Sequence, residues 1–133
     1  MACKKLKEIT LIVFEQKHIR KEWIYDFEDT RFQRFYDLLS KDMKKHGIAL
    51  LLVRNRESVI TVNSYADLLN VVKVSSPADG HLQQCVGHII GKSENLDILE
   101  DIRTAVRRVA FAPETIAPSG EFRKVCHNCG CGC

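Results

Sequence analysis

Four of the six cysteines of this chain lie within its last eight residues, and this clustering constrains the fold more than any other feature. A disulfide-stabilised scaffold distributes its cysteines along the chain to close large loops. The clustered residues close only very short loops, and the other two, Cys3 and Cys85, stand alone. The chain must therefore fold by burying apolar side chains, and 133 residues are enough for one such core. The clustered cysteines are Cys126, Cys129, Cys131 and Cys133.

The composition is that of an ordinary globular domain. Hydrophobic residues make up 45% and charged residues 28% of the sequence, and the formal net charge is +3. So mild a charge permits an acidic partner without requiring one, and nucleic-acid-binding domains are usually more basic. No apolar run approaches the ~20 residues of a membrane-spanning helix, and the charged start of the chain does not resemble a signal peptide. We therefore expect a cytoplasmic protein with no membrane span.

Four segments have the composition or alternation of β-strands. Ile9–Phe14 is rich in β-branched residues, and the partly alternating segment Ile19–Phe27 is expected to pair with it as a hairpin. Ile48–Val53 is a continuous apolar run, which is typical of a buried strand. The polar residues 54–58 are expected to form a turn, after which Val59–Val62 pairs back as the fourth strand.

Two helices are predicted in the first half of the chain. Within Thr30–His46 the apolar residues recur at spacings of three and four, which is one face of a helix. Asp29 or Thr30 is expected to cap its start, and Gly47 is expected to end it in a left-handed conformation. Ser64 is expected to cap a second helix, with Asp67 three residues on and an apolar set that extends to Val72.

The second half is predicted to be helical. A loop of turn-forming residues, 75–80, precedes a short helix expected over His81–Ile90. A longer helix, capped by Ser93 or Asn95, is stopped by Pro113. Its apolar stripe consists of Leu96, Leu99, Ile102, Val106 and Val109.

These elements predict an α+β fold. We expect a small mixed or mostly antiparallel sheet of about four strands, packed with three to four helices. Residues 1–112 are predicted to form the globular domain, and residues 113–133 a linker followed by the cysteine-rich tail.

The spacing of the clustered cysteines predicts a thiolate metal site. Cys126-x-x-Cys129-Gly resembles one knuckle of a zinc ribbon, in which two thiolates reach the same ion. A tetrahedral site needs four ligands, and no second Cys-x-x-Cys is present. Cys131 and Cys133, each preceded by glycine, can supply the remaining two. Zinc is the expected ion, and Cu(I) or an iron–sulfur cluster suits the same soft ligands.

Further ligands can come from four other residues. His127 lies inside the cysteine cluster, and His81, Cys85 and His88 would share one face of the helix predicted there. Simpler interpretations stand beside this one. Cys85 is surrounded by apolar residues and is expected to be a core cysteine, and His81 can be a solvated residue at a helix start. The tail itself can be an end of the chain with free or oxidised thiols.

Several function classes remain open on the sequence alone. The first is an accessory or regulatory protein that binds a metal through its tail and contacts another protein. The second is thiol–disulfide or sulfur-transfer chemistry at Cys126 and Cys129. The third is a nucleic-acid-binding regulator, in which a zinc knuckle lies near scattered basic residues. No hydrolase, metalloprotease or dinucleotide-binding motif is present, so we lean against an enzyme.

A fourth possibility is lipid attachment. The terminal Cys131-Gly-Cys133 resembles the tail on which Rab-type small GTPases receive two prenyl groups. The resemblance covers three residues. The chain has no phosphate-binding Gly-x-x-x-x-Gly-Lys-Ser/Thr loop and is therefore not such a GTPase.

Overall fold

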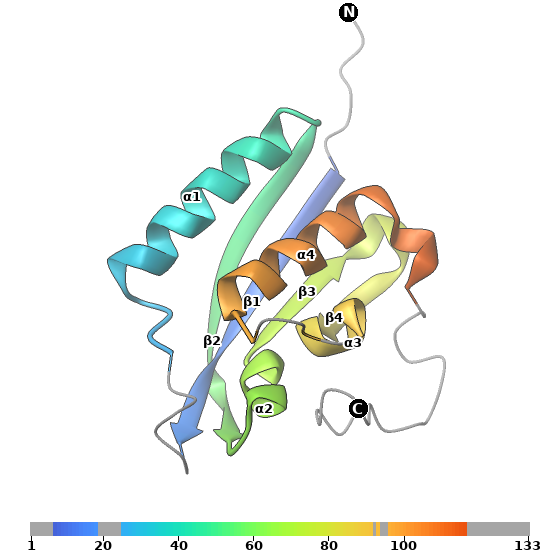
Figure 1. Cartoon of the computed structure of the whole chain (residues 1–133). Helices are drawn as coiled ribbons and strands as arrows, with labels where there is room; N and C mark the ends of the chain where they lie inside the picture. The colour runs from blue at the N-terminus through green and yellow to red at the C-terminus, as the bar shows by residue number, and fades with distance from the viewer. Residues whose placement is uncertain (1–6, 19–24, 92, 94–95, 117–133) are drawn as a thin grey trace, which may run out of the picture.

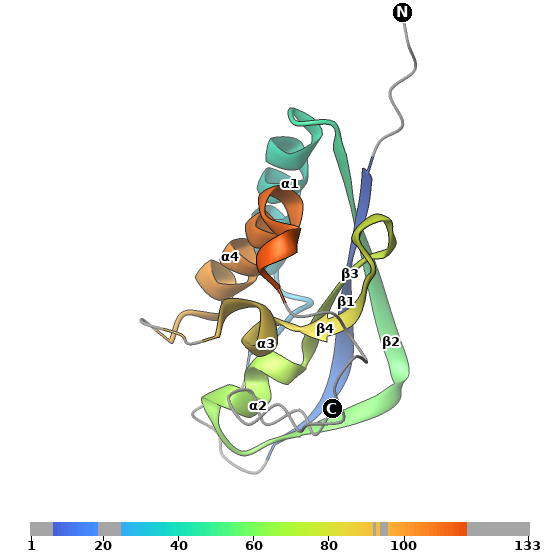
Figure 2. The ribbon, with the colours of Figure 1, turned by 90° about the vertical axis from the view of Figure 1, so that its right-hand side faces the viewer.

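A four-stranded mixed sheet with helices on one of its faces forms the fold, as the α+β prediction requires (Figures 1 and 2). The computed structural model describes residues 7–18, 25–91, 93 and 96–116. The strands are β1 (Lys7–His18), β2 (Ile48–Val62), β3 (Val72–Ser76) and β4 (His81–Cys85). The helices are α1 (Thr30–Lys44), α2 (Tyr65–Asn70), α3 (Val86–Ile90) and α4 (Ile98–Phe111). Two short 3-10 helices, Pro77–Asp79 and Pro113–Thr115, complete the described elements.

The first strand lies inside the sheet, whose order is β2-β1-β3-β4. β1 pairs in parallel with β2 and antiparallel with β3, and α1 makes the crossover that a parallel pair requires. The predicted hairpin is therefore wrong in its pairing. Tyr25 and Phe27 belong to no strand, and residues 19–24 lie outside the described residues.

The polar residues after Val53 do not reverse the chain. β2 continues through them as one strand, because Asn55 pairs with Phe14 and Val59 pairs with the next residue of β1. Arg56, Glu57 and Ser58 bulge out between these two pairs, and the Asn55 side chain accepts hydrogen bonds from the backbone N–H groups of both Glu57 and Ser58. The sequence had suggested a turn here because a bulge uses the same polar residues as a turn.

The region expected to be a helix after residue 80 begins with a strand. β3 and β4 form an antiparallel hairpin, connected by the 3-10 helix and Gly80, whose φ is +79°. The predicted helix over His81–Ile90 is therefore wrong for its first half and right for α3. The second predicted helix also ends earlier than expected, since Val72 already belongs to β3.

Helix boundaries follow the local chemistry closely. α1 has the predicted extent to within two residues, and Gly47 follows it with a φ of +75°. The Ser64 hydroxyl accepts a hydrogen bond from the N–H of Asp67, as predicted. α4 is capped by Asp97, whose carboxylate accepts from two N–H groups, instead of by Ser93 or Asn95.

The core lies between the sheet and the helices. Ile9, Leu11 and Val13 of β1 alternate toward it, and Ile102 and Val106 of α4 pack from the other side. Such a two-layer arrangement buries one face of the sheet and one stripe of each helix. None of the described helices is both long and apolar enough to cross a bilayer.

Candidate functional site

The cysteine cluster begins ten positions after Ile116, the last described residue of the fold. Cys126, Cys129, Cys131, Cys133 and His127 lie outside the described residues. The structure therefore does not test the arrangement of these five residues.

The other three candidate ligands do not share a helix face. His81 opens β4, Cys85 ends it, and His88 lies in α3. His81 and Cys85 are buried, with 4% and 2% of their surface exposed. Within residues 7–18, 25–91, 93 and 96–116, no three His, Cys, Asp or Glu side chains come together as a metal site. The prediction that these three residues share one face of a helix is wrong. His81 and Cys85 are the two ends of strand β4, and only His88 lies in a helix.

His81 has a structural contact instead. Its Nε2 lies 2.9 Å from the carbonyl oxygen of Pro113, and its other ring nitrogen is buried without a hydrogen-bond partner among the described residues. A proton on Nε2 satisfies this contact, since a carbonyl oxygen only accepts. His81 thereby ties β4 to the segment that follows α4.

Arg108 also holds this segment. Its guanidinium donates to the backbone oxygen and to the hydroxyl of Thr115, each at 2.8 Å, and to the carbonyl oxygen of Ile89. Ile116, the next residue, is buried in the core. The last described segment, Pro113–Thr115 with Ile116, is therefore held against β4 by His81 and against α3 through Arg108.

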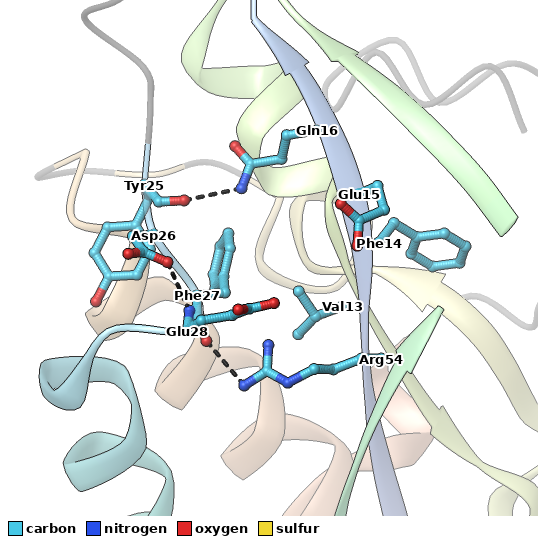
Figure 3. A pocket seen from close by; sticks show the side chains of 9 residues that line it. All are labelled: Val13, Phe14, Glu15, Gln16, Tyr25, Asp26, Phe27, Glu28 and Arg54. Atoms are coloured by element: carbon cyan, nitrogen blue, oxygen red, sulfur yellow. Dashed lines mark hydrogen bonds between the residues drawn. The ribbon is translucent and has the colours of Figure 1, made fainter. Parts of the chain in front are cut away.

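A separate concave region lies at the far end of β1. This pocket of about 370 Å³ is formed by β1, by the turn before α1 and by Arg54 of β2 (Figure 3). The Nη2 of Arg54 donates to the carbonyl oxygen of Phe27 at 2.9 Å, and the amide of Gln16 donates to that of Tyr25 at 2.8 Å. Its lining residues are Val13, Phe14, Glu15, Gln16, Tyr25, Asp26, Phe27, Glu28 and Arg54.

Two of the three carboxylates at this pocket form ion pairs. Arg56, in the bulge of β2, lies 2.8 Å from Glu15 and 2.9 Å from Glu28. The hydrogen bond and the charge of Arg56 lower the pKa of Glu28, so that this carboxylate stays ionised. The third carboxylate, Asp26, accepts a hydrogen bond from the N–H of Glu28.

Tyr25 adds a phenol that stays protonated. Burial raises its pKa, and the neighbouring carboxylates add to this effect while Arg31 opposes it. The ionised carboxylate of Glu28 and the protonated phenol of Tyr25 can hold a polar group by accepting and donating hydrogen bonds. The sequence alone did not identify this pocket. In the sequence, Arg54 and Arg56 are two of several scattered basic residues, and the parallel pairing of β1 with β2 is what brings Arg56 to Glu15.

The described residues thus form a mixed α+β domain whose last segment is held by His81 and Arg108. Comparison with protein-family models, with curated proteins and with solved structures found no match.

Proposed function

We propose that this protein binds a soft metal ion, zinc by default, through Cys126, Cys129, Cys131 and Cys133, as an accessory or regulatory protein. The observation that carries the proposal is the spacing of four thiols within eight residues, with glycine before and after Cys131. Thiolates favour zinc, Cu(I) and iron–sulfur clusters. Glycine at alternate positions lets a short backbone wrap around one ion.

The architecture of the domain supports a tail that acts separately from the core. Ile116 closes the core, and Arg108 and His81 hold the segment just before it. The described residues thus bury an apolar core of their own, to which Ile116 contributes. We propose that the ion is handed to, or sensed for, another protein, and that the protein works in the cytoplasm, where thiols stay reduced.

The test is metal analysis of protein purified without oxygen, with an absorption spectrum and a count of free thiols. We expect about one equivalent of zinc per chain, lost in the Cys129→Ser and Cys131→Ser variants. The matched control is Cys3→Ser, because Cys3 lies apart from the cluster. If the protein contains copper in place of zinc, the thiolate site stands and only the ion changes. Visible absorption bands together with bound iron and sulfide would indicate an iron–sulfur cluster.

One result would overturn the proposal. If the protein contains no metal, takes up none when zinc is added, and shows four reactive thiols, the cluster is not a metal site. Thiol–disulfide exchange or sulfur transfer would then be the function to test, through the reactivity of Cys126 and Cys129.

A further inference from the structure

The exposed side of α1 carries a row of basic side chains interrupted by a leucine. Arg34, Lys41 and Lys45 are separated by seven and four residues, so they lie on one side of the helix. Leu38 lies between Arg34 and Lys41 in the same row, and 62% of its surface is exposed. Among the described residues, no carboxylate lies within ion-pair distance of Arg34, Lys41 or Lys45.

This row borders a groove between α1 and α4, which lie next to each other in the helix layer (Figure 1). The groove has a volume of about 310 Å³. Its apolar floor comes from Phe35, Leu38 and Leu39 of α1, and its polar wall from Asp42, Arg103 and Arg107.

The wall is already arranged around ion pairs. Arg107 lies 2.7 Å from Asp42, and Arg103 lies 3.8 Å from Glu100. All four side chains keep between 40% and 52% of their surface exposed, so both arginines can still meet a ligand. The unpaired positive charge of this face therefore lies on α1, directly beside the apolar floor.

Packing of the hydrophobic core does not account for a leucine at position 38. Leu38 is not among the buried residues of α1, which are Phe32, Leu39 and Met43. A leucine so exposed, beside a groove and between unpaired cations, is typical of a contact surface.

We propose that the α1/α4 groove docks an acidic segment of a partner protein that carries an apolar side chain. The apolar side chain enters the groove over Phe35, Leu38 and Leu39, and the carboxylates of the segment meet Arg34, Lys41 and Lys45. Helix-in-groove recognition combines apolar anchors and flanking charge in this way. The apolar floor favours a protein over a nucleic acid, since phosphates require only the positive charge.

This surface belongs to the folded domain and does not depend on a metal in the cysteine cluster. Docking is therefore measured on both the full chain and its Cys129→Ser variant, so that loss of metal and loss of docking are separate results.

The test is a selection from a displayed library of helical peptides with equal numbers of acidic, neutral and basic members. Each charge class is built with and without one leucine or tryptophan. Affinities of the enriched peptides are then measured by fluorescence anisotropy at physiological salt. We expect acidic peptides with an apolar residue to be enriched, and to bind about ten-fold more tightly than their counterparts without it.

Variants locate the site. Leu38→Glu and Lys41→Glu should each weaken binding of the selected peptide about ten-fold or more. Leu51→Glu and Lys17→Glu are the controls, because both residues are exposed on strands of the sheet. These two variants should bind the selected peptide as tightly as the unchanged protein does. Circular dichroism confirms that each variant is folded.

Two results would overturn the proposal. The first is a library in which acidic peptides are not enriched, or in which their binding survives Leu38→Glu and Lys41→Glu. The second is that a 20-base-pair DNA duplex binds the protein, that Leu38→Glu and Lys41→Glu weaken this binding, and that acidic peptides do not bind. That result would assign the face to nucleic acid.

Discussion

Lys7 connects the beginning of the sheet to the end of the last helix. Its ammonium group lies 2.9 and 3.2 Å from the carbonyl oxygens of Val109 and Ala110, and 2.6 Å from the carboxylate of Asp79. A cation at the C-terminus of a helix also interacts favourably with the helix dipole. This one side chain therefore stabilises the position of α4 and, through it, the start of the tail.

The Lys7–Asp79 contact predicts a pH-dependent contribution to stability. Burial alone would raise the pKa of Asp79, but the hydrogen bonds from Lys7 and Ser76 outweigh it and hold the pKa below its ordinary value. A carboxyl whose folded pKa is lowered contributes stability above about pH 4, and loses it as the pH falls through the folded value.

We expect Asp79→Asn to lower the free energy of unfolding by about 1–2 kcal/mol at pH 7. The difference from the unchanged protein should shrink below about pH 4. Urea unfolding across this pH range measures both effects, and Glu57→Gln, an exposed carboxylate, is the control. A difference that stays constant down to pH 3 would contradict the assignment.

Tyr65 and Asp101 form a buried contact that gives a second prediction. The hydroxyl of Tyr65 donates to the carboxylate of Asp101, and both side chains are buried. Burial and this hydrogen bond raise the pKa of Tyr65 above its ordinary value, so the hydroxyl stays protonated.

We expect Tyr65→Phe to cost about 1–3 kcal/mol of stability, because it removes a donor from a buried carboxylate. Combined with Asp101→Leu, the two substitutions should cost less than the sum of their separate effects. Chemical unfolding of the two single variants and the double variant measures this coupling. Strictly additive costs would show that the contact is not a coupled pair.

At the scale of the element, the helix caps differ in a way that can be tested. Asp97 accepts hydrogen bonds from the N–H groups of Leu99 and Glu100, whereas Asp29 before α1 makes no side-chain cap hydrogen bond. We expect Asp97→Ala to destabilise the protein by about 1 kcal/mol and Asp29→Ala by much less. Thermal unfolding of the two variants compares them directly, and equal losses would show that the caps are equivalent.

The elements also show where sequence patterns suffice. The extent of α1 was predicted well because its apolar spacing and the following Gly47 agree, although the expected cap hydrogen bond from Asp29 does not form. The extents of β2 and β4 were not predicted, because a bulge and a short strand have local patterns that also fit a turn or a helix. The five residues of β4 are defined by pairing with β3, which is a tertiary contact.

At the scale of the whole molecule, the tail and the domain should respond separately to metal removal. We expect a strong chelator to leave the far-ultraviolet circular dichroism and the thermal transition of the protein unchanged, because the described residues bury an apolar core between the sheet and the helices. The Cys129→Ser, Cys131→Ser double variant should unfold at the same temperature. Unfolding on chelation would instead make the metal a structural one.

The candidate sites were predictable to different extents. The thiol cluster is a local pattern, so sequence alone reveals it. The pocket at β1 and the α1/α4 groove join residues far apart in the chain, such as Glu15 with Arg56 and Asp42 with Arg107. No single-sequence pattern predicts contacts of this kind, because they depend on strand order and helix packing.

The place of β1 inside the sheet has a consequence for synthesis of the chain. Both of its neighbours are made later, since β2 ends at Val62 and β3 at Ser76. A growing chain emerges at about 5–20 residues per second. The apolar face of β1, with Ile9, Leu11 and Val13, therefore waits several seconds for partners while its backbone is unpaired on both edges. During that interval the nascent chain exposes an apolar strand with two unpaired edges, which is a condition that favours aggregation.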